Sequence, residues 1–159
     1  MPSSEAMRSV GLLILRVGVG GFMVTHGWAK LQMAMESGLS AFPDPLGLGA
    51  GPSLLSATAA ELGGALCVVL GLLTRVSALA VAFTMGVAAF VIHGADPWTM
   101  QQGAALFSAG DAESWSSKEP ALIYLVPFLA LVFTGPGTIS LDEKLWRRRR
   151  SAATTPPEA

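Results

Sequence analysis

The chain has 159 residues, of which 52% are hydrophobic and only 13% are charged, and its mean hydropathy is +0.54. This composition is typical of a membrane protein, because a soluble domain of the same length would alternate apolar with polar residues. The formal net charge of −1 implies no general attraction to nucleic acid. Cys67 is the single cysteine, which excludes an intramolecular disulfide and any cysteine-based zinc, haem or iron–sulfur motif. A redox role would therefore need a borrowed cofactor or a partner.

The first apolar block runs from about Val10 to Thr25 and closes at His26-Gly27-Trp28. Arg16 interrupts this block and no convincing small-residue cleavage site follows it, so we predict a retained transmembrane helix and not a signal peptide. Residues 32–53 then hold three prolines and several glycines, which indicates a structured or re-entrant loop.

Two further apolar blocks, at about residues 54–73 and 76–92, are separated only by Thr74-Arg75. A link this short predicts an antiparallel helical hairpin. The loop that follows carries Trp98 and Trp115, which indicate a short surface helix at the level of the lipid headgroups.

A fourth apolar block begins near Glu119-Pro120 and ends by Gly135-Pro136-Gly137. Pro127 lies inside this block and predicts a kink. Together the four blocks predict an all-α fold, namely a polytopic membrane protein built as a four-helix transmembrane bundle. Residues 1–145 would form this single domain, and residues 146–159 a basic, flexible cytoplasmic tail.

Basic residues are unevenly distributed about the four predicted spans. Seven fall on one side and two on the other; the seven are Arg8, Arg75, Lys144, Arg147, Arg148, Arg149 and Arg150, and the two are Lys30 and Lys118. The positive-inside bias therefore predicts a multi-pass protein of the cell membrane with both termini in the cytoplasm. Arg75 and the four-arginine run would hold this orientation, the run by meeting anionic lipid headgroups.

Five ionisable residues lie inside or at the edge of the spans and are the candidate site residues: Arg16, His26, Glu61, His93 and Glu119. An ionisable group in hydrocarbon costs about 2.5–3.5 kcal/mol on insertion scales. Each of the five therefore needs a partner, a wet cavity or a neutral state.

Small residues share the helix faces of these candidates. Steps of three or four residues lead from His93 to Ala89, Gly86 and Ala82, and from Glu61 to Ala57, Gly64 and Ala65, while Arg16 shares its stripe with Gly20 and Met23. Small residues mark close helix approach in membranes. The candidates are therefore predicted to point into the bundle, with Gly86 at a helix–helix contact.

Depth along the spans indicates which candidates meet. At about 1.5 Å of rise per residue from the cytoplasmic side, Arg16 lies at ~9 Å and Glu61 at ~20 Å, with His26 and His93 farther out at ~24 and ~26 Å. We predict an interior pair between Arg16 and Glu61. We also predict a polar pocket, shaped by Glu61 with His26 or His93, that opens toward the outer side.

Structural roles stay open for all five candidates. One alternative is that the Arg16–Glu61 pair does no more than fix the helix register. Another is that the two histidines only satisfy loop carbonyls near the interface. Two histidines with a carboxylate could also form a metal site or a proton relay, but their spacing is not a local ligand motif, so no metal is assigned. Glu119 stands where Ser116 or Ser117 caps a helix, and favourable interaction with that helix N-terminus is its expected role.

Several of these residues lie in motifs that resemble those of DoxX-type membrane proteins. The matching stretches are Leu15-Arg16-Val17-Gly18 through His26-Gly27-Trp28-Ala29-Lys30-Leu31, then Phe42-Pro43-Asp44-Pro45-Leu46-Gly47, Glu61-Leu62-Gly63-Gly64 to Gly71-Leu72-Leu73-Thr74-Arg75, His93-Gly94, and Gly135-Pro136-Gly137-Thr138-Ile139-Ser140-Leu141-Asp142. The resemblance extends from about Leu12 to Leu145 and implies a four-helix membrane domain. The family takes its name from a subunit of a thiosulfate:quinone oxidoreductase, and some similar proteins are associated with membrane oxidoreductase complexes.

Three hypotheses follow from the residues and the resemblance. The leading one is an accessory or quinone-interacting subunit of a membrane redox system without an intrinsic cofactor, in which Arg16, Glu61 and His93 supply polar groups to an apolar quinone cleft. Glu61 and the histidines would then handle protons. The second is a non-catalytic membrane scaffold or chaperone-like binding protein, and the third is a small-solute or proton-coupled transporter that acts as a dimer. The expected partners are the lipid bilayer, membrane or cytoplasmic redox proteins and further copies of the chain, but not nucleic acid.

Overall fold

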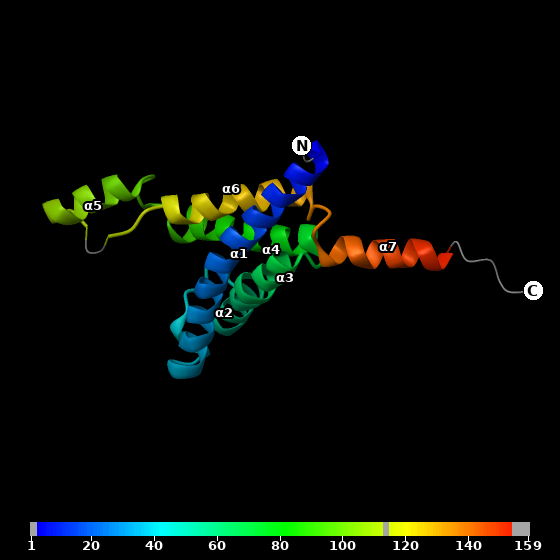
Figure 1. The fold of residues 1–159 in the computed structure, drawn as a ribbon. Coiled ribbons are helices and arrows are strands. Elements are labelled where there is room, and N and C mark those ends of the chain that lie inside the picture. The colour runs from blue at the N-terminus through cyan, green and yellow to red at the C-terminus, as the bar shows by residue number, and fades with distance from the viewer. Residues whose placement is uncertain (1–2, 113–114, 154–159) are drawn as a thin grey trace, which may run out of the picture.

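The computed structural model describes residues 3–112 and 115–153, and within these ranges the chain is helical with connecting loops and no strand. Three helical stretches, Ser4–Glu36, Ala50–Leu70 and Thr74–Ile92, are long and apolar enough to cross a membrane, and a shorter apolar helix spans Glu119–Thr134. Figure 1 shows these four stretches packed together, with the other helices extending from their ends. The predicted all-α transmembrane bundle is confirmed.

Helix α1 (Ser4–Glu36) has 33 residues and is therefore about 50 Å long. It starts where the Ser3 hydroxyl accepts a hydrogen bond from the Ala6 N–H, at 3.2 Å. The expectation that this helix ends near Thr25 is wrong, because the helix continues for more than two further turns. Gly27, which suggested a helix end, is buried inside the helix instead.

The second span contains three helical segments in series, α2 (Ala50–Thr58), the π-helical segment η2 (Ala59–Gly64) and α3 (Ala65–Leu70). A short 3₁₀ turn, η1 (Leu39–Ala41), precedes them.

The loop before α2 is held by Asp44, whose carboxylate accepts hydrogen bonds from the N–H groups of Leu48 and Gly49 and from the Ser53 hydroxyl, at 2.8–2.9 Å. The bond from Gly49, followed by that from Ser53, lowers the pKa of Asp44 below its ordinary value. The loop is therefore structured, as predicted.

The third span consists of α4 (Thr74–Val87) and the π-helical segment η3 (Ala88–Ile92). It follows α3 through a tight hairpin in which Gly71 has φ +71° and Leu73 has φ +47°, so the predicted antiparallel hairpin is confirmed. The carboxylate of Asp142 accepts hydrogen bonds from the N–H groups of Leu73 and Thr74 at the start of α4, at 2.7 and 2.9 Å. A residue far along the chain thus caps this helix.

The remaining helices are α5 (Met100–Ala109), α6 (Glu119–Thr134) and α7 (Leu141–Ala153). Helix α5 is the short helix predicted in the second loop, and it lies beside the bundle and not within it (Figure 1). Helix α6 has 16 residues, with Pro127 inside it, and at about 24 Å it is the shortest of the four apolar stretches. Helix α7 replaces most of the flexible tail that we expected from residue 146; residues 154–159 lie outside the described part of the chain.

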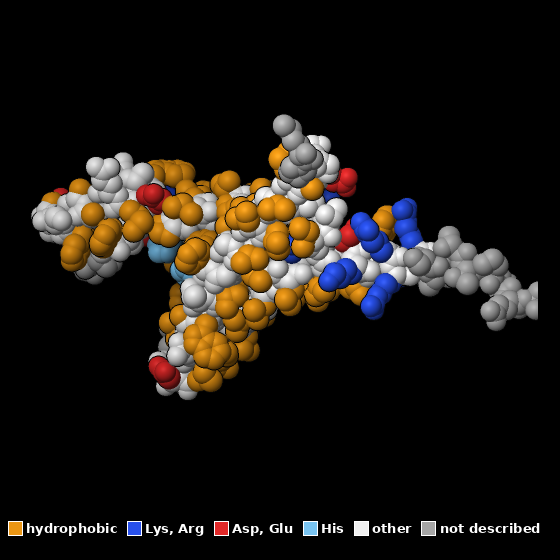
Figure 2. All heavy atoms as spheres, viewed as in Figure 1, with side chains coloured by type: hydrophobic (Ala, Val, Ile, Leu, Met, Phe, Trp, Pro, Cys, Tyr) orange, Lys and Arg blue, Asp and Glu red, His pale blue; other side chains and the backbone are white. Residues whose placement is uncertain are grey.

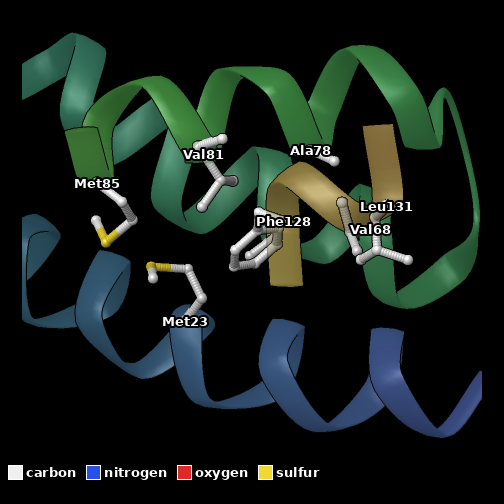
Figure 3. Close-up of a cluster of buried hydrophobic side chains, with 9 residues drawn as sticks. Met23, Val68, Ala78, Val81, Met85, Phe128 and Leu131 are labelled. Carbon is white, nitrogen blue, oxygen red and sulfur yellow. The ribbon is translucent and has the colours of Figure 1, made fainter. Parts of the chain in front are cut away.

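The core joins all four apolar stretches. α4 packs mainly against α6, and α1 packs mainly against η2 and α3. Figure 3 shows Met23 of α1 and Met85 of α4 with their sulfur atoms turned toward each other beside Phe128 of α6. All three side chains are buried.

The predicted small-residue stripe on the third span is only partly confirmed. Ala82 and Ala89 are buried, but a Cβ atom built at Gly86 would meet nothing within 4 Å, so Gly86 is not at a helix contact. The buried positions of this span include Ala78, Val81, Ala82, Met85 and Ala89, so its buried face runs through Met85 and not through Gly86.

Two pairs of elements diverge toward one end of the bundle. In Figure 1, α1 and α2 run together toward the lower left, whereas α4 and α6 run toward α5. The opposite end is tied together, because the Ser9 hydroxyl accepts hydrogen bonds from the N–H and the hydroxyl of Thr138, at 3.3 and 2.8 Å. We call the first end the open end and the second the terminal end, since the N-terminus and α7 lie there.

Candidate functional site

A cavity of about 230 Å³ lies at the open end, between the α1–α2 pair and the α4–α6 pair. Its walls come from the 42–48 loop, α2, α4, η3 and the first turns of α6, and they are mostly apolar. The ionisable side chains among its lining residues are His26, Lys30, Glu61, His93 and Tyr124. Figure 2 shows histidine side chains, in pale blue, in the angle between the diverging pairs. A mostly apolar cavity with a few convergent polar groups is the usual form of a small-molecule site.

An ion pair between Lys30 and Glu61 forms the polar part of this cavity. The Lys30 Nζ atom lies 2.5 Å from Glu61 Oε2, and the side chains are 23% and 3% exposed. Glu61 lies in the π-helical segment η2, and such segments occur often at functional sites. The pair satisfies a carboxylate that would otherwise be buried and unpartnered.

Close packing of α1 on η2 brings Lys30 to Glu61. A Cβ atom at Gly27 would lie 2.7 Å from the backbone carbon of Glu61 and 2.7 Å from Leu62 Cα, so only glycine allows this approach. Lys30 follows Gly27 by three residues on the same helix face, which places its side chain at the contact.

Sequence reasoning missed Lys30, because it ended the first span near Thr25, before His26-Gly27-Trp28, and counted Lys30 as a loop charge. The signal was available. The buried positions of α1 include Arg16, Gly20, Met23 and Gly27, and one more step of three residues reaches Lys30.

Arg16 points into the bundle, as predicted, but the predicted pair with Glu61 is wrong. Its side chain is fully buried, and its guanidinium group donates to the carbonyls of Val68 and Val69 at 3.3 and 3.4 Å and of Ile139 at 2.5 Å. Carbonyls at a helix C-terminus lack intrahelical partners and carry partial negative charge. Arg16 therefore caps the end of α3, which is closer than Glu61, and holds the segment before α7 against it.

The two histidines line the cavity from opposite sides. The His26 ring packs edge-to-face on the Tyr124 ring of α6, with 5.2 Å between centroids and 76° between planes. His93 Nδ1 lies 2.7 Å from Asp96 Oδ2, and the two side chains are 36% and 28% exposed. Asp96 lies beyond the third span, and its hydrogen bond with His93, followed by one with Ser116, lowers its pKa.

Glu119 is not brought to the cavity. Its Oε2 atom accepts a hydrogen bond from the Met100 N–H at 2.7 Å, at the start of α5, while Glu119 itself lies in the first turn of α6. Glu119 therefore lies at a helix N-terminus, as predicted, but it also contacts the N-terminus of a second helix, α5. Lys118, and neither Ser116 nor Ser117, occupies the cap position of α6.

The basic residues assigned to membrane orientation gather at the terminal end. Arg75 donates to the Val132 carbonyl at 3.1 Å. Arg147 bonds to Glu143 at 2.7 Å, and the Arg150 guanidinium lies 3.8 Å from the centroid of the Trp146 ring. Figure 2 shows the basic side chains, in blue, around α7. Arg148 and Arg149 are exposed on the same helix.

Within residues 3–112 and 115–153, no three His, Cys, Asp or Glu side chains are grouped so that they could hold a metal ion.

Comparison with known proteins places the chain in a family. The DoxX family model matches residues 11–94, which is more than half of the chain. The chain belongs to the DoxX family. The part that matches in this DoxX protein runs from α1 to just beyond η3 and contains His26, Lys30, Glu61 and His93.

Two curated proteins resemble this DoxX protein along most of their length. An uncharacterized protein of Haemophilus influenzae is 31% identical over 151 residues, covering 93% of this chain and 100% of the relative. The inner membrane protein YqjF of Escherichia coli is 30% identical over 148 residues, covering 89% of this chain and 96% of the relative. No solved structure matches the chain. Family and apolar helices together identify a membrane protein.

Proposed function

We propose that this DoxX protein binds the headgroup of a quinone in the open-end cavity and acts as an accessory subunit of a membrane redox system. The observation that carries the proposal is the Lys30–Glu61 ion pair inside a mostly apolar cavity. A quinone ring is apolar on its faces and carries carbonyl oxygens at its edge. The Lys30 ammonium group and the cavity histidines are donors that suit such oxygens, and hydrogen bonds to charged groups contribute about 1.5–3 kcal/mol each.

Groups that can exchange protons support the same proposal. His93 lies beside Asp96 at the partly exposed edge of the cavity, and Glu61 lies deeper. A quinone gains or loses protons when it is reduced or oxidised, so a titratable group near its oxygens and a second one near the surface would serve that exchange. The electrons would come from a partner redox protein, since the sequence carries no haem or iron–sulfur motif.

Binding of a short-chain quinone to the detergent-purified protein tests the proposal. Lys30→Met should weaken binding about tenfold or more, which corresponds to losing about 1.4 kcal/mol, and should also lower stability because it leaves Glu61 buried without a partner. The double variant Lys30→Met with Glu61→Gln removes both charges and should recover much of the stability. We expect it to remain defective in binding. A double variant that binds the quinone as tightly as the wild type would contradict the proposal and assign the pair to structure alone.

One observation favours a scaffold as the second candidate function. Helix α7 extends beyond the bundle (Figure 1) and carries acidic and basic residues around its exposed surface. Two results together would favour the scaffold. The full chain would bind no quinone, and removal of residues 143–159 would abolish the co-purification of a membrane partner.

A further inference from the structure

We infer that the ligand of the open-end cavity is a long-chain amphiphile whose tail leaves the cavity sideways, between α2 and α4, into the bilayer. This inference rests on the proposed function, and it names the class of ligand and its path. It depends on how the two flanks of the cavity are built.

The flank between α2 and α4 is not closed by tight helix packing. The main neighbours of α2 are α1, η1 and η2, whereas those of α4 are α6, η2, η3 and α3. Small side chains from both helical stretches line the cavity there, namely Ser56 and Ala57 on α2, Thr84 on α4 and Ala88 on η3, beside the larger Met85 and Val87. The inferred path of the tail, here called the gap, passes between these small side chains.

Large apolar side chains form the rim of this gap. Leu48 and Phe83 line the cavity and are each 61% exposed, and Leu46 and Ile92 are 47% and 42% exposed. Such a cluster would be unfavourable in water and is stable in hydrocarbon. Phe83 follows the first residue of α4 by nine positions, so it lies ~14 Å along a span that crosses a hydrocarbon layer of about 30 Å. The gap therefore faces the acyl chains, near the middle of the membrane.

The opposite flank is closed by aromatic contact. His26 of α1 and Tyr124 of α6 pack edge-to-face there, with 5.2 Å between ring centroids. An apolar tail would have to displace this contact and pass two polar side chains. The α2–α4 flank offers the less costly path.

The size of the cavity requires such a path. Its volume of about 230 Å³ is below the range of about 300–1,000 Å³ for sites that enclose a drug-sized ligand. It can hold one substituted ring but not an isoprenoid or acyl chain in addition. A membrane-dissolved quinone would therefore place its ring beside Lys30 and leave its chain in the gap.

The test compares a quinone that carries a long isoprenoid chain with the same ring lacking the chain, both titrated into lipid nanodiscs that hold the full-length protein. Ala88→Phe fills the gap, and Ala80→Phe makes the same change on an exposed position of α4 that does not line the cavity. We expect the wild type and Ala80→Phe to bind the long-chain quinone about tenfold or more tightly than the bare ring. Ala88→Phe should lose about tenfold in long-chain affinity relative to Ala80→Phe, so that its preference for the long-chain quinone over the bare ring disappears.

Ala57→Leu, made from the facing helix, repeats the test in case Ala88→Phe does not fold, as judged by size-exclusion chromatography and circular dichroism. The sideways path would be overturned if Ala88→Phe and Ala57→Leu bind the long-chain quinone as tightly as Ala80→Phe does. The proposed function would remain intact in that case. Failure of the wild type to bind either ligand would instead overturn the proposed function, and this inference with it.

Discussion

Arg16 and Glu61 show two ways in which a membrane helix can hold a buried charge. Glu61 has a cationic partner 2.5 Å away, whereas Arg16 donates to three backbone carbonyls. Both arrangements offset a cost of about 2.5–3.5 kcal/mol for a charge within hydrocarbon. The two arrangements have different consequences. A charged group of an ion pair in a cavity can exchange its protein partner for a ligand, whereas a guanidinium group that caps a helix has a structural role.

Replacing Arg16 should therefore destabilise the protein without affecting the ligand directly. Arg16→Met removes the side-chain donor of the Val69 and Ile139 carbonyls and one of the donors of the Val68 carbonyl, which also accepts from the Gly71 N–H, and this should lower the free energy of unfolding by about 2 kcal/mol or more. Arg75→Met is the matched control, because Arg75 donates to one carbonyl at an exposed site, and it should change stability by no more than about 0.5 kcal/mol. Thermal unfolding in mild detergent measures both. Equal Tm values for the two variants would show that the capping role is negligible.

Residue chemistry allowed much of the site to be predicted. His26, Glu61 and His93 were chosen because ionisable groups in a span need an explanation, and all three line one cavity. The partner of Glu61 could not be obtained from depth alone. Axial counting brought Arg16 toward Glu61, but it took no account of the open carbonyls at the end of α3, which are nearer and need a donor.

At the scale of elements, the approach of α1 to η2 positions the site. Gly27 allows backbone to meet backbone at this crossing, and Lys30 reaches Glu61 only because the crossing is so close. Leucine-rich packing would separate the two helices by a further side-chain layer. The ion pair thus depends on a residue that has no side chain.

Gly27→Ala should consequently be costly although alanine favours helices. The added methyl group would lie within 2.7 Å of Glu61 and Leu62 backbone atoms, and overpacking of this kind costs about 1–3 kcal/mol. Gly21→Ala, on the same helix with nothing within 4 Å of its Cβ position, should be neutral or stabilising by up to about 1 kcal/mol. Thermal unfolding compares the variants. Equal stability would mean that the close crossing does not contribute to the fold.

The spans were easier to predict than the packing between them. Long apolar blocks and a two-residue hairpin gave the four stretches, because hydrocarbon thickness fixes helix length. Helix faces were predicted less well. Arg16, Gly20 and Met23 are all buried, in agreement with the stripe on α1, whereas the buried face of the third span runs through Met85 and not through the predicted Gly86.

For the whole molecule, the uneven distribution of basic residues between the two ends is the basis of the predicted orientation. Lys30 and Lys118 are the two basic residues at the open end in the predicted topology. Lys30 is engaged by Glu61, and Lys118 is 9% exposed with its Nζ atom 4.8 Å from the centre of the Trp98 ring. Arg75, Arg147 and Arg150 at the terminal end also have partners, so the predicted orientation rests on the number of basic residues at each end.

Labelling of single cysteines in intact cells tests this orientation. In a Cys67→Ser background, Ser3→Cys and Ala153→Cys should resist a membrane-impermeant maleimide, while Ser108→Cys on α5 should react. Permeabilised cells provide the control, because all three should then be labelled. Reaction of Ser3→Cys or Ala153→Cys in intact cells would reverse the predicted topology.

The π-helical segments make the spacing of the site sensitive to insertion and deletion. Across η3 each hydrogen bond can reach five residues back, as from His93 to Ala88, and η2 is of the same type. Deleting a single residue anywhere within Ala59–Gly64 could be absorbed by a return to α-helical bonding. The flanking α2 and α3 would keep their register, because a π-helical turn is an α-helical turn with one extra residue, so α3 would keep its contact with Arg16 while Glu61, inside the altered turn, would no longer face the cavity. The number of residues in these segments is therefore constrained as strictly as the identity of the charged ones, and a one-residue gap at η2 in a homologous sequence would mark a chain that has lost this site while keeping its fold.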